Sequence, residues 1–563
     1  MRKALALLLC LILIVVPVMS VPAFAEPEDP GYTADADSTT FTVYTPAGLN
    51  AVASLINAPE TNATYQSYTI VLAADLDFEA AFGGERNWTP IGYTSADQKT
   101  YYPFFGTFDG AGHTIKGLYT VATVGGKRFQ GLIGVGIGCT IKNVTVADSV
   151  FEGLEFVAAI LGVDDGGDVV IQNCHVLNCT IKAPVSNGNN VGGIVGRFRG
   201  GQTATGIKGF KVKSVLIEDC TVLADMESFR NIGGICGGEA VGATDVWTAT
   251  FRNCVTAGTY TYYHKSTDGA SGIFAYNAGN SSDSAAAAMT INFENCVSVA
   301  NIVNAAEGGN KIYGSICHLI RDGAYTMTNC IGMGAYSATL TSMKAAVHTL
   351  TIDNCAIYDP AATGVGEASF WVNADTIDES KAVAGTATID GEASTFKGAT
   401  LPVITTAQMV ERIETMYTDA AFRARALAIV NAKVHEIKLI GVQQTKVEND
   451  KVSVRVIGGL YALDFEKVTF NVQVNSGETS ANVAKDTTSA YTSINATDVN
   501  GDQIVLTAAD LDAAYLTALR LINIPATGTY TFTVSITATI DAENSSFAEA
   551  ISFTVTDGVL EVQ

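Results

Sequence analysis

The sequence predicts an all-β protein made of a right-handed parallel β-helix (a solenoid), a short helical connector and a β-sandwich domain. The main observation is a four-residue phrase that recurs seven times: an apolar residue, a spacer, Asn or Asp, then Cys or Val. Recurrence at intervals of tens of residues is typical of solenoids. A second observation is the strong two-residue alternation that resumes after residue 435. The phrase reads IKNV from Ile141, IQNC from Ile171, IEDC from Ile217, FRNC from Phe251, FENC from Phe293, MTNC from Met327 and IDNC from Ile352.

Residues 1–25 have the features of a signal peptide. Arg2 and Lys3 precede an apolar run, and Ala23-Phe24-Ala25 is a small-x-small cleavage site. The run is shorter than the roughly 20 apolar residues that a membrane helix needs. We therefore expect a secreted or cell-surface protein with no membrane insertion after signal cleavage.

The charge of the chain limits its partners. The formal net charge is −23, and it becomes −25 once the two basic residues of the signal are removed. Nucleic acids and anionic membranes both require a basic surface. The sequence therefore argues against both as partners, and it calls for no cofactor.

Ten cysteines remain after cleavage, all between Cys139 and Cys355. In an exported protein the usual expectation is disulfides, and stacked coils about 4.8 Å apart would allow them sterically. We favour reduced, inward-facing thiols that act as small apolar residues; metal binding is disfavoured because the chain has no CxxC pair or histidine cluster. Cys236 and Cys317 share one position in the GGICG-like segments. Six others occupy the last position of the phrase: Cys174, Cys220, Cys254, Cys296, Cys330 and Cys355.

Residues 26–78 are interpreted as an N-terminal cap. Thr45 and Pro46 precede a short apolar-periodic run, which is typical of a helix start. The run 68–78 alternates as a first strand would. A cap is needed because the end of a solenoid exposes unpaired strands and an open core.

Residues 87–92 (NWTPIG) and 104–118 (FFGTFDGAGHTIKGL) carry a family resemblance. They are similar to the opening coil of bacterial surface proteins with a β-helix of the pectate-lyase-like kind. The resemblance covers roughly residues 40–358, and it implies the fold while saying little about activity. Three later segments resemble the GLUG motif of such proteins: GLIG (131–134), GGIVG (192–196) and GGICG (233–237).

The β-helix is assigned to residues 79–360. Within 169–198, three short alternating segments are separated by polar or glycine-containing corners, which indicates three strands in each coil. The Asn of the phrase suits a corner because it tolerates a left-handed backbone and its amide can stack on the next one. Each repeat of the phrase is therefore expected to mark a corner.

The phrase stops near residue 360, and the composition changes twice after it. Residues 361–434 are interpreted as a helical connector or cap, because 405–433 have apolar residues at helical spacing. Residues 435–563 alternate as an Ig-like β-sandwich, with 509–522 as a helical insertion.

Asp164, Asp165 and Asp168 are weak candidates for catalysis. The fold also serves pectate lyases and polygalacturonases, and two carboxylates can act as acid and base on a glycoside. The chain lacks the companion motifs of a polygalacturonase, and its acidic residues are scattered. A solvated glycine-rich corner is the favoured interpretation.

Tyr260, Tyr262 and Tyr263 are weak candidates for ligand binding, since aromatic rings stack on sugars. Two of them share a strand face, so packing in the core is favoured. Trp88 and Trp247 are interpreted as structural. His435-Glu436 is not followed by the second histidine of a zinc-peptidase motif.

The sequence thus favours a non-catalytic secreted or cell-surface adhesin. Its partner would be a glycan, including a polysaccharide, or a host or matrix protein. Two alternatives stay open. One is a polysaccharide lyase or glycoside hydrolase of the β-helix class with a divergent site; the other is a structural spacer of the cell envelope.

Overall fold

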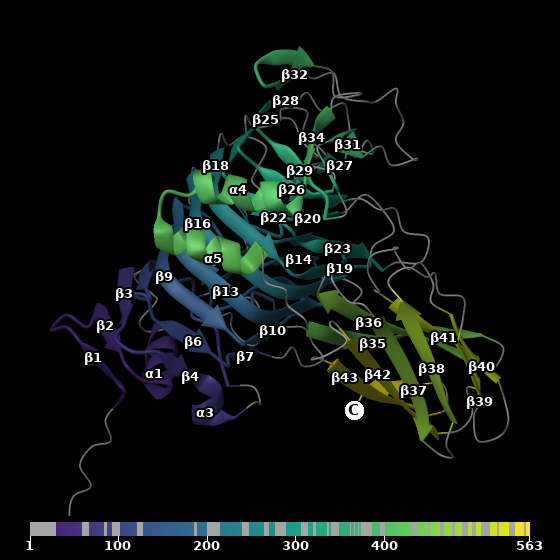
Figure 1. Cartoon of the computed structure of the whole chain (residues 1–563). Coiled ribbons are helices and arrows are strands. Elements are labelled where there is room, and N and C mark those ends of the chain that lie inside the picture. The colour runs from purple at the N-terminus through teal and green to yellow at the C-terminus, as the bar shows by residue number, and fades with distance from the viewer. Residues whose placement is uncertain are drawn as a thin grey trace, which may run out of the picture.

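The fold is mostly parallel β-structure with few helices, as a computed structural model of the chain shows (Figure 1). The predicted signal peptide, residues 1–25, lies outside the described residues. The structure describes residues 30–58, 67–83, 87–92, 102–120, 128–184, 189–199, 214–238, 247–263, 269–275, 289–305, 313–318, 323–334, 337–338, 348–360, 362–364, 366–369, 371–372, 386–394, 400–430, 436–448, 451–461, 467–475, 479–486, 494–497, 503–507, 518–525, 529–539, 546–556 and 559–562.

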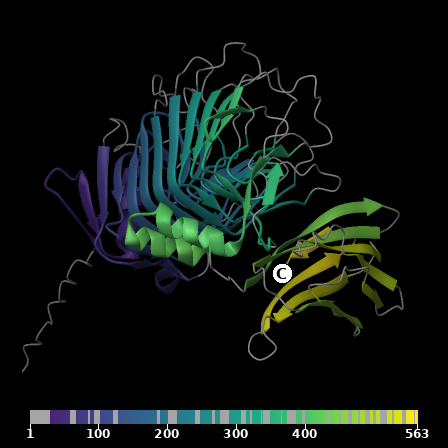
Figure 2. The same ribbon diagram turned by 45° about the horizontal axis from the view of Figure 1, so that its top comes forward.

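One side of the molecule is a continuous stack of parallel strands, each from a successive coil of the chain (Figure 2). Consecutive coils therefore lie on one another, which bears out the predicted parallel stacking. In order, these strands are β2 (Thr40–Val43), β3 (Ser67–Leu72), β5 (Phe105–Asp109), β9 (Thr140–Ala147), β13 (Val169–Ala183), β16 (Ser214–Ser228), β18 (Trp247–Ala257), β21 (Met289–Glu294), β25 (Gly323–Thr328), β28 (His348–Asp353) and β32 (Thr386–Ile389).

The other sides of each coil are built from shorter strands that also pair in parallel with their counterparts above and below. The second side contains β4 (Leu76–Asp77), β6 (Thr114–Lys116), β22 (Val297–Ser298), β26 (Ile331–Met333), β29 (Ala356–Tyr358) and β34 (Thr400–Ile404). The third contains β7 (Tyr119–Thr120), β10 (Val150–Glu152), β19 (Thr259–Tyr262) and β23 (Asn301–Asn304). The chain returns through β8 (Ile133–Gly136), β11 (Glu155–Ala158), β12 (Leu161–Asp164), β14 (Asn189–Gly192), β15 (Val195–Phe198), β17 (Ile232–Gly233), β20 (Ala270–Ser271) and β24 (Tyr313–Gly314).

The Asn or Asp of the phrase forms the corner between the first and second sides of a coil. All seven of these residues have a positive φ, between 50° and 55°. In a regular strand, side chains three residues apart point to opposite faces. The left-handed residue breaks this alternation. The first and last residues of the phrase therefore both point inward. The seven residues are Asn143, Asn173, Asp219, Asn253, Asn295, Asn329 and Asn354.

The corner amides also bond from coil to coil, as the sequence predicted. Asn295 Nδ2 donates to Asn253 Oδ1 at 3.0 Å, and Asn329 Nδ2 donates to Asn295 Oδ1 at 3.0 Å. Further steps of the same ladder join Asn173 to Asn143, Asn253 to Asp219, and Asn354 to Asn329. Each amide thus contributes to the register of two neighbouring coils.

The ten cysteines are all buried, and none forms a disulfide. The six at the end of the phrase lie in one inward column, in which Cys220 and Cys254 are direct register partners. Burial raises the pKa of the Cys220 thiol well above its usual range. All ten side chains belong to the buried apolar core, where they pack as small apolar groups, in agreement with the favoured interpretation.

The N-terminal region is already part of the stack, since β2 pairs in parallel with β3. The predicted helix start is confirmed: α1 (Pro46–Ile56) has Thr45 as its N-cap, and Thr45 Oγ1 accepts from Gly48 N at 3.0 Å. The hairpin strand β1 (Tyr32–Ala34) pairs antiparallel with β2, and the short helix α3 (Phe78–Phe82) follows β4.

The stack continues past the expected end at residue 360, because β32 and β34 still pair in parallel with β28 and β29. Two predicted connector helices follow, α4 (Thr406–Met416) and α5 (Ala420–Val430). They pack along the second side of the stack (Figure 2), where Met409, Ile413 and Phe422 join a cluster with Val297 and Ile331. Four minor strands complete this region: β27 (Ser337–Ala338), β30 (Gly366–Ser369), β31 (Trp371–Val372) and β33 (Glu392–Ser394).

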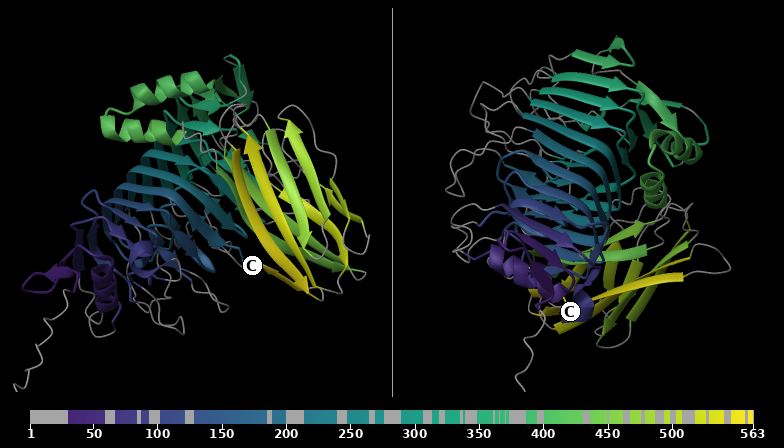
Figure 3. Two further views of the ribbon diagram at one scale, coloured as in Figure 1. Left: turned by 60° about the horizontal axis from the view of Figure 1, so that its bottom comes forward. Right: turned by 90° about the vertical axis from the view of Figure 1, so that its left-hand side faces the viewer.

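The C-terminal residues form two five-stranded antiparallel sheets (Figure 3). The predicted helical insertion at 509–522 is wrong for its described part: residues 518–525 form strand β41, which pairs with β36 and β40. Residues 509–517 lie outside the described part. One sheet contains β35 (Glu436–Glu448), β36 (Lys451–Tyr461), β41 (Ala518–Pro525), β40 (Gln503–Thr507) and β39 (Ile494–Thr497); the other contains β38 (Thr479–Asp486), β37 (Lys467–Asn475), β42 (Thr529–Thr539), β43 (Ser546–Thr556) and β44 (Val559–Val562).

Replacing Asn295 separates the two roles of a corner residue. Asn295→Gly keeps the left-handed backbone but loses two ladder bonds, each worth about 0.5–1.5 kcal/mol. Asn295→Ala loses the same bonds and adds the left-handed strain of about 1–2 kcal/mol. We expect both variants to lower the urea midpoint of the full chain, and the alanine variant to lower it further. Equal midpoints for the two would contradict the corner's need for a left-handed residue.

Candidate binding pocket and the fate of the predicted site residues

Asp164 and Asp168, two of the carboxylates proposed for catalysis, each bond the backbone. Asp164 ends β12 and is fully buried; its carboxylate accepts from Gly166 N at 3.1 Å and from Gly138 N at 3.4 Å. Burial raises the pKa of Asp164 well above its usual range. Asp168 is exposed and accepts from Ser214 N at 3.1 Å.

Asp165, the third of these carboxylates, is held by a basic residue from the next coil. Arg199 donates to its two oxygens from Nε at 2.9 Å and from Nη2 at 3.2 Å, and both side chains are buried. Burial raises the pKa of Asp165 although Arg199 opposes the shift. The corner is therefore not the solvated one that we expected. Its carboxylates are committed to separate structural partners, and they do not converge as an acid–base pair.

The three tyrosines proposed for ligand binding are buried. Tyr260 and Tyr262 are completely inaccessible and belong to the core, in line with the favoured interpretation. Tyr263 donates through its hydroxyl to Glu227 Oε1 at 2.9 Å. None of the three offers an open ring to a sugar. His435 and the Trp247 side chain lie outside the described part of the structure.

A charged cluster that the sequence did not reveal lies beside Tyr263. Glu152, Lys182 and Glu227 are register neighbours on three successive coils. Burial raises the pKa of both carboxyl groups, and the nearby Lys182 opposes the shift. Each pair is separated by tens of residues in the sequence, so only the coil register brings the three together.

Over the described residues, no group of three or more His, Cys, Asp or Glu side chains is arranged to hold a metal ion. Within the same part of the chain, no helix has the length and apolar character to span a membrane.

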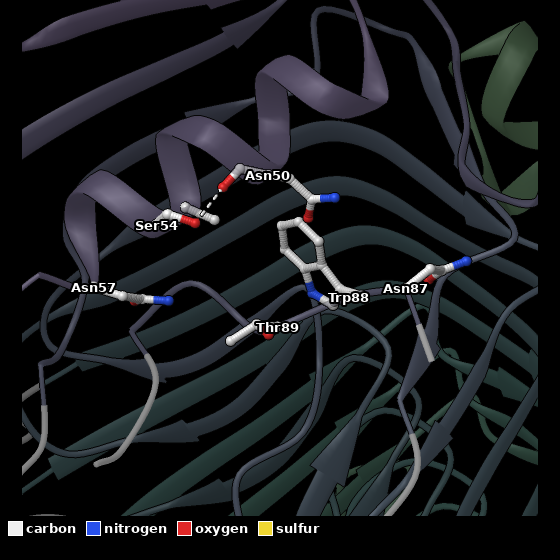
Figure 4. A pocket seen from close by; sticks show the side chains of 7 residues that line it. Asn50, Ser54, Asn57, Asn87, Trp88 and Thr89 are labelled. Carbon is white, nitrogen blue, oxygen red and sulfur yellow. Dashed lines mark hydrogen bonds between the residues drawn. The ribbon is translucent and has the colours of Figure 1, made fainter. Parts of the chain in front are cut away.

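A hollow of about 280 Å³ opens at the N-terminal end of the stack, between α1 and the segment 87–89 (Figure 4). None of its lining residues carries a charge. It is lined by Asn50, Ala53, Ser54, Asn57, Asn87, Trp88 and Thr89.

The hollow has a rigid wall. Trp88 is buried, donates through Nε1 to Gly131 O at 3.0 Å and packs edge-on against Phe78. Asn57 donates through Nδ2 to Pro90 O at 2.9 Å and accepts at Oδ1 from Gly92 N at 2.8 Å. These bonds join the end of α1 to the following segment, so the shape of the hollow is set by the fold.

Two polar groups of the hollow are available to a ligand. The side-chain amide of Asn50 and the hydroxyl of Thr89 make no hydrogen bond to the described residues, and Figure 4 shows Asn50 pointing toward Trp88. An amide both donates and accepts, as does a hydroxyl. The hollow can therefore bind an uncharged hydroxylated group, and it holds no acid or base for catalysis. The sequence missed it because its two walls lie about 35 residues apart.

A scan of the chain against models of known protein families finds no match, and a search of curated protein sequences finds none either.

Replacing Asp164 tests the uncharged state of its buried carboxyl. A pKa raised by folding means that stability is fully present below the ordinary aspartate pKa, about 3.9, and falls as the pH rises toward the folded value. Asp164→Asn removes this pH dependence, although its amide keeps only one of the two acceptor oxygens, so we expect a flatter profile of urea midpoint against pH than that of the wild type above about pH 4. The exposed Asp168→Asn serves as the control and should keep the wild-type profile. A wild-type midpoint that is as constant from acidic to neutral pH as that of D164N would show that burial does not hold Asp164 neutral.

Proposed function

We propose that this protein is a non-catalytic, exported cell-surface protein that binds an uncharged glycan in the hollow between α1 and residues 87–89. Its scaffold is a right-handed parallel β-helix of the pectate-lyase-like kind with GLUG-type repeats. The C-terminal sheets form an Ig-like sandwich that serves as spacer or attachment module.

The observation that carries the proposal is the chemistry of the hollow. Asn50 and Thr89 offer hydrogen-bonding groups that have no partner among the described residues, and the buried Trp88 fixes the wall behind them. Sugar hydroxyl groups bond to such donors and acceptors, so the hollow suits one sugar ring or a chain end. The chain's acidic surface disfavours anionic sugars, since like charges repel.

The rest of the structure agrees with a binding role. The carboxylates that suggested catalysis are occupied by Arg199 and by backbone amides. Two other non-catalytic functions remain: binding of a host or matrix protein, and a spacer role in the cell envelope. Neither function would use the hollow.

A polysaccharide-active enzyme is the second candidate, and one observation favours it. Glu152 and Glu227 flank Lys182 on successive coils, and burial raises the pKa of both carboxyl groups. A general acid for glycoside cleavage needs such a raised pKa. Release of reducing ends from polysaccharides by the wild type, abolished in Glu227→Gln, would establish this alternative.

Asn50→Leu tests the glycan-binding proposal. The change removes the amide that a sugar hydroxyl would bond, while leucine favours the helix as well as asparagine does. On a panel of neutral glycans the mature chain should bind at least one member, and N50L should bind it about tenfold more weakly, the effect of losing one or two hydrogen bonds.

Asn292→Leu is the matched control, because it removes an amide from β21, away from the hollow. Binding reduced equally in both variants would exclude the hollow as the site. Failure of the wild type to bind any neutral glycan would overturn the proposal.

A further inference from the structure

The open first side of the stack carries two columns of threonines. On β18, β21, β25, β28 and β32, the outward positions alternate with inward residues such as Ile291 and Leu350, which are buried. Seven of the nine outward positions whose side chains the structure describes are threonine. The first column is Thr248, Thr290, Ala324 and Thr349; the second is Thr250, Asn292, Thr326, Thr351 and Thr388.

The sheet sets the spacing of these side chains in two directions. Neighbouring strands lie about 4.8 Å apart, and residues two apart along a strand are about 6.6 Å apart. Threonine is β-branched, so its χ1 angle is restricted and its hydroxyl and methyl groups occupy fixed positions. The nine positions, which we name the threonine lattice, form a regular two-dimensional net.

The threonine lattice carries no charge, although the chain as a whole has a net charge of −23. The next outward column is charged, and most of its ions pair with one another. Arg252 bonds Glu218 at 3.0 Å and Glu294 at 2.7 Å, while Asp353 lies exposed at the end of this column. The two columns of the lattice itself therefore suit an uncharged surface better than an ionic one.

The lattice is accessible. Thr248 and Thr349 are exposed, and Thr250, Thr326 and Thr351 are partly exposed. The helices α4 and α5 pack on the neighbouring second side of the stack, where they contact residues such as Val297 and Ile331. They therefore leave these threonines to the solvent.

We propose that the threonine lattice binds ice. Each hydroxyl contributes one weak hydrogen bond, so a useful affinity requires a partner that bonds many hydroxyls at once. The partner should also be rigid beforehand, because a flexible one would lose conformational entropy on binding. A crystal face meets this condition. Hexagonal ice presents such faces, with oxygen atoms at regular intervals in two directions that hydroxyl groups can bond.

The composition of the lattice favours ice over a crystalline polysaccharide. Sugar surfaces are recognised by aromatic rings that stack on them, and none of the nine positions is aromatic. The regularly spaced methyl groups and hydroxyls of threonine instead suit an ordered layer of water molecules. This inference does not depend on the glycan-binding hollow, which lies at the N-terminal end of the stack.

The test measures the mature full-length chain on ice. The wild type should show thermal hysteresis and partition into slowly growing ice. Thr326→Tyr raises a bulky ring at the centre of the lattice, so its ice-bound fraction should fall about tenfold. Thr351→Lys adds a charge and provides a second variant should the first fail to fold. Thr33→Tyr, on the N-terminal strand β1, is the matched control and should bind ice as the wild type does.

Three outcomes would overturn the inference. The wild type could be excluded from ice, or both folded lattice variants could retain full ice binding. Alternatively, the wild type could bind crystalline cellulose or chitin and lose that binding in T326Y, which would assign the face to a polysaccharide. Asn50→Leu should leave ice binding unchanged, which separates this result from that of the glycan proposal.

Discussion

The left-handed corner at the Asn or Asp of the phrase is the constraint on which the rest of the structure depends. A regular strand cannot turn two side chains three residues apart to the same face. With a left-handed residue between them, Ile217 and Cys220 both enter the core, as Phe293 and Cys296 do in a later coil. Asparagine tolerates this backbone better than most residues, and its amide bonds the coils on either side. One residue type thus sets the bend of each coil and helps to set the register between coils.

The corner also explains why cysteine follows it. The position after the turn lies deep in the stack and adjoins the same position of the next coil, so a small apolar side chain fits where a larger one would crowd its neighbours. Cys254, for example, is completely buried, and its Sγ lies near the Ile217 carbonyl oxygen of the preceding coil. Burial in apolar surroundings raises the pKa of the thiol and makes it a poor nucleophile. The cysteine column is therefore a packing feature, and it needs neither oxidation nor metal to account for it.

The sequence predicted whatever follows from local repetition. The corner residues, the inward cysteines and the start of α1 at Thr45 were all readable, because each depends on neighbours within a few residues. Features that depend on coil register were not. The partner of Asp165 is Arg199, a full coil later, and corner lengths vary too much for that pairing to be read from the chain. The helix predicted for 509–522 overlaps strand β41 at residues 518–522, because a short apolar run fits both periods and only pairing with neighbouring strands decides between them.

The separation between inward and outward positions bears on how such a protein acquires a function. Inward residues are fixed by packing, whereas outward residues on the same strands are free to vary as long as they suit a β-strand. In this chain the outward positions divide into an ion-paired column containing Arg252 and uncharged columns rich in threonine. Packing of the core requires neither pattern. Because the coils are stacked, either pattern repeats along the stack as a periodic surface. Every coil repeats the same spacing. An outward residue that binds a ligand weakly in one coil therefore contributes to a higher total affinity when it recurs in several coils. The function of this chain is therefore best sought in surfaces that extend over several coils and in the hollow at their end, rather than in one cluster of reactive groups.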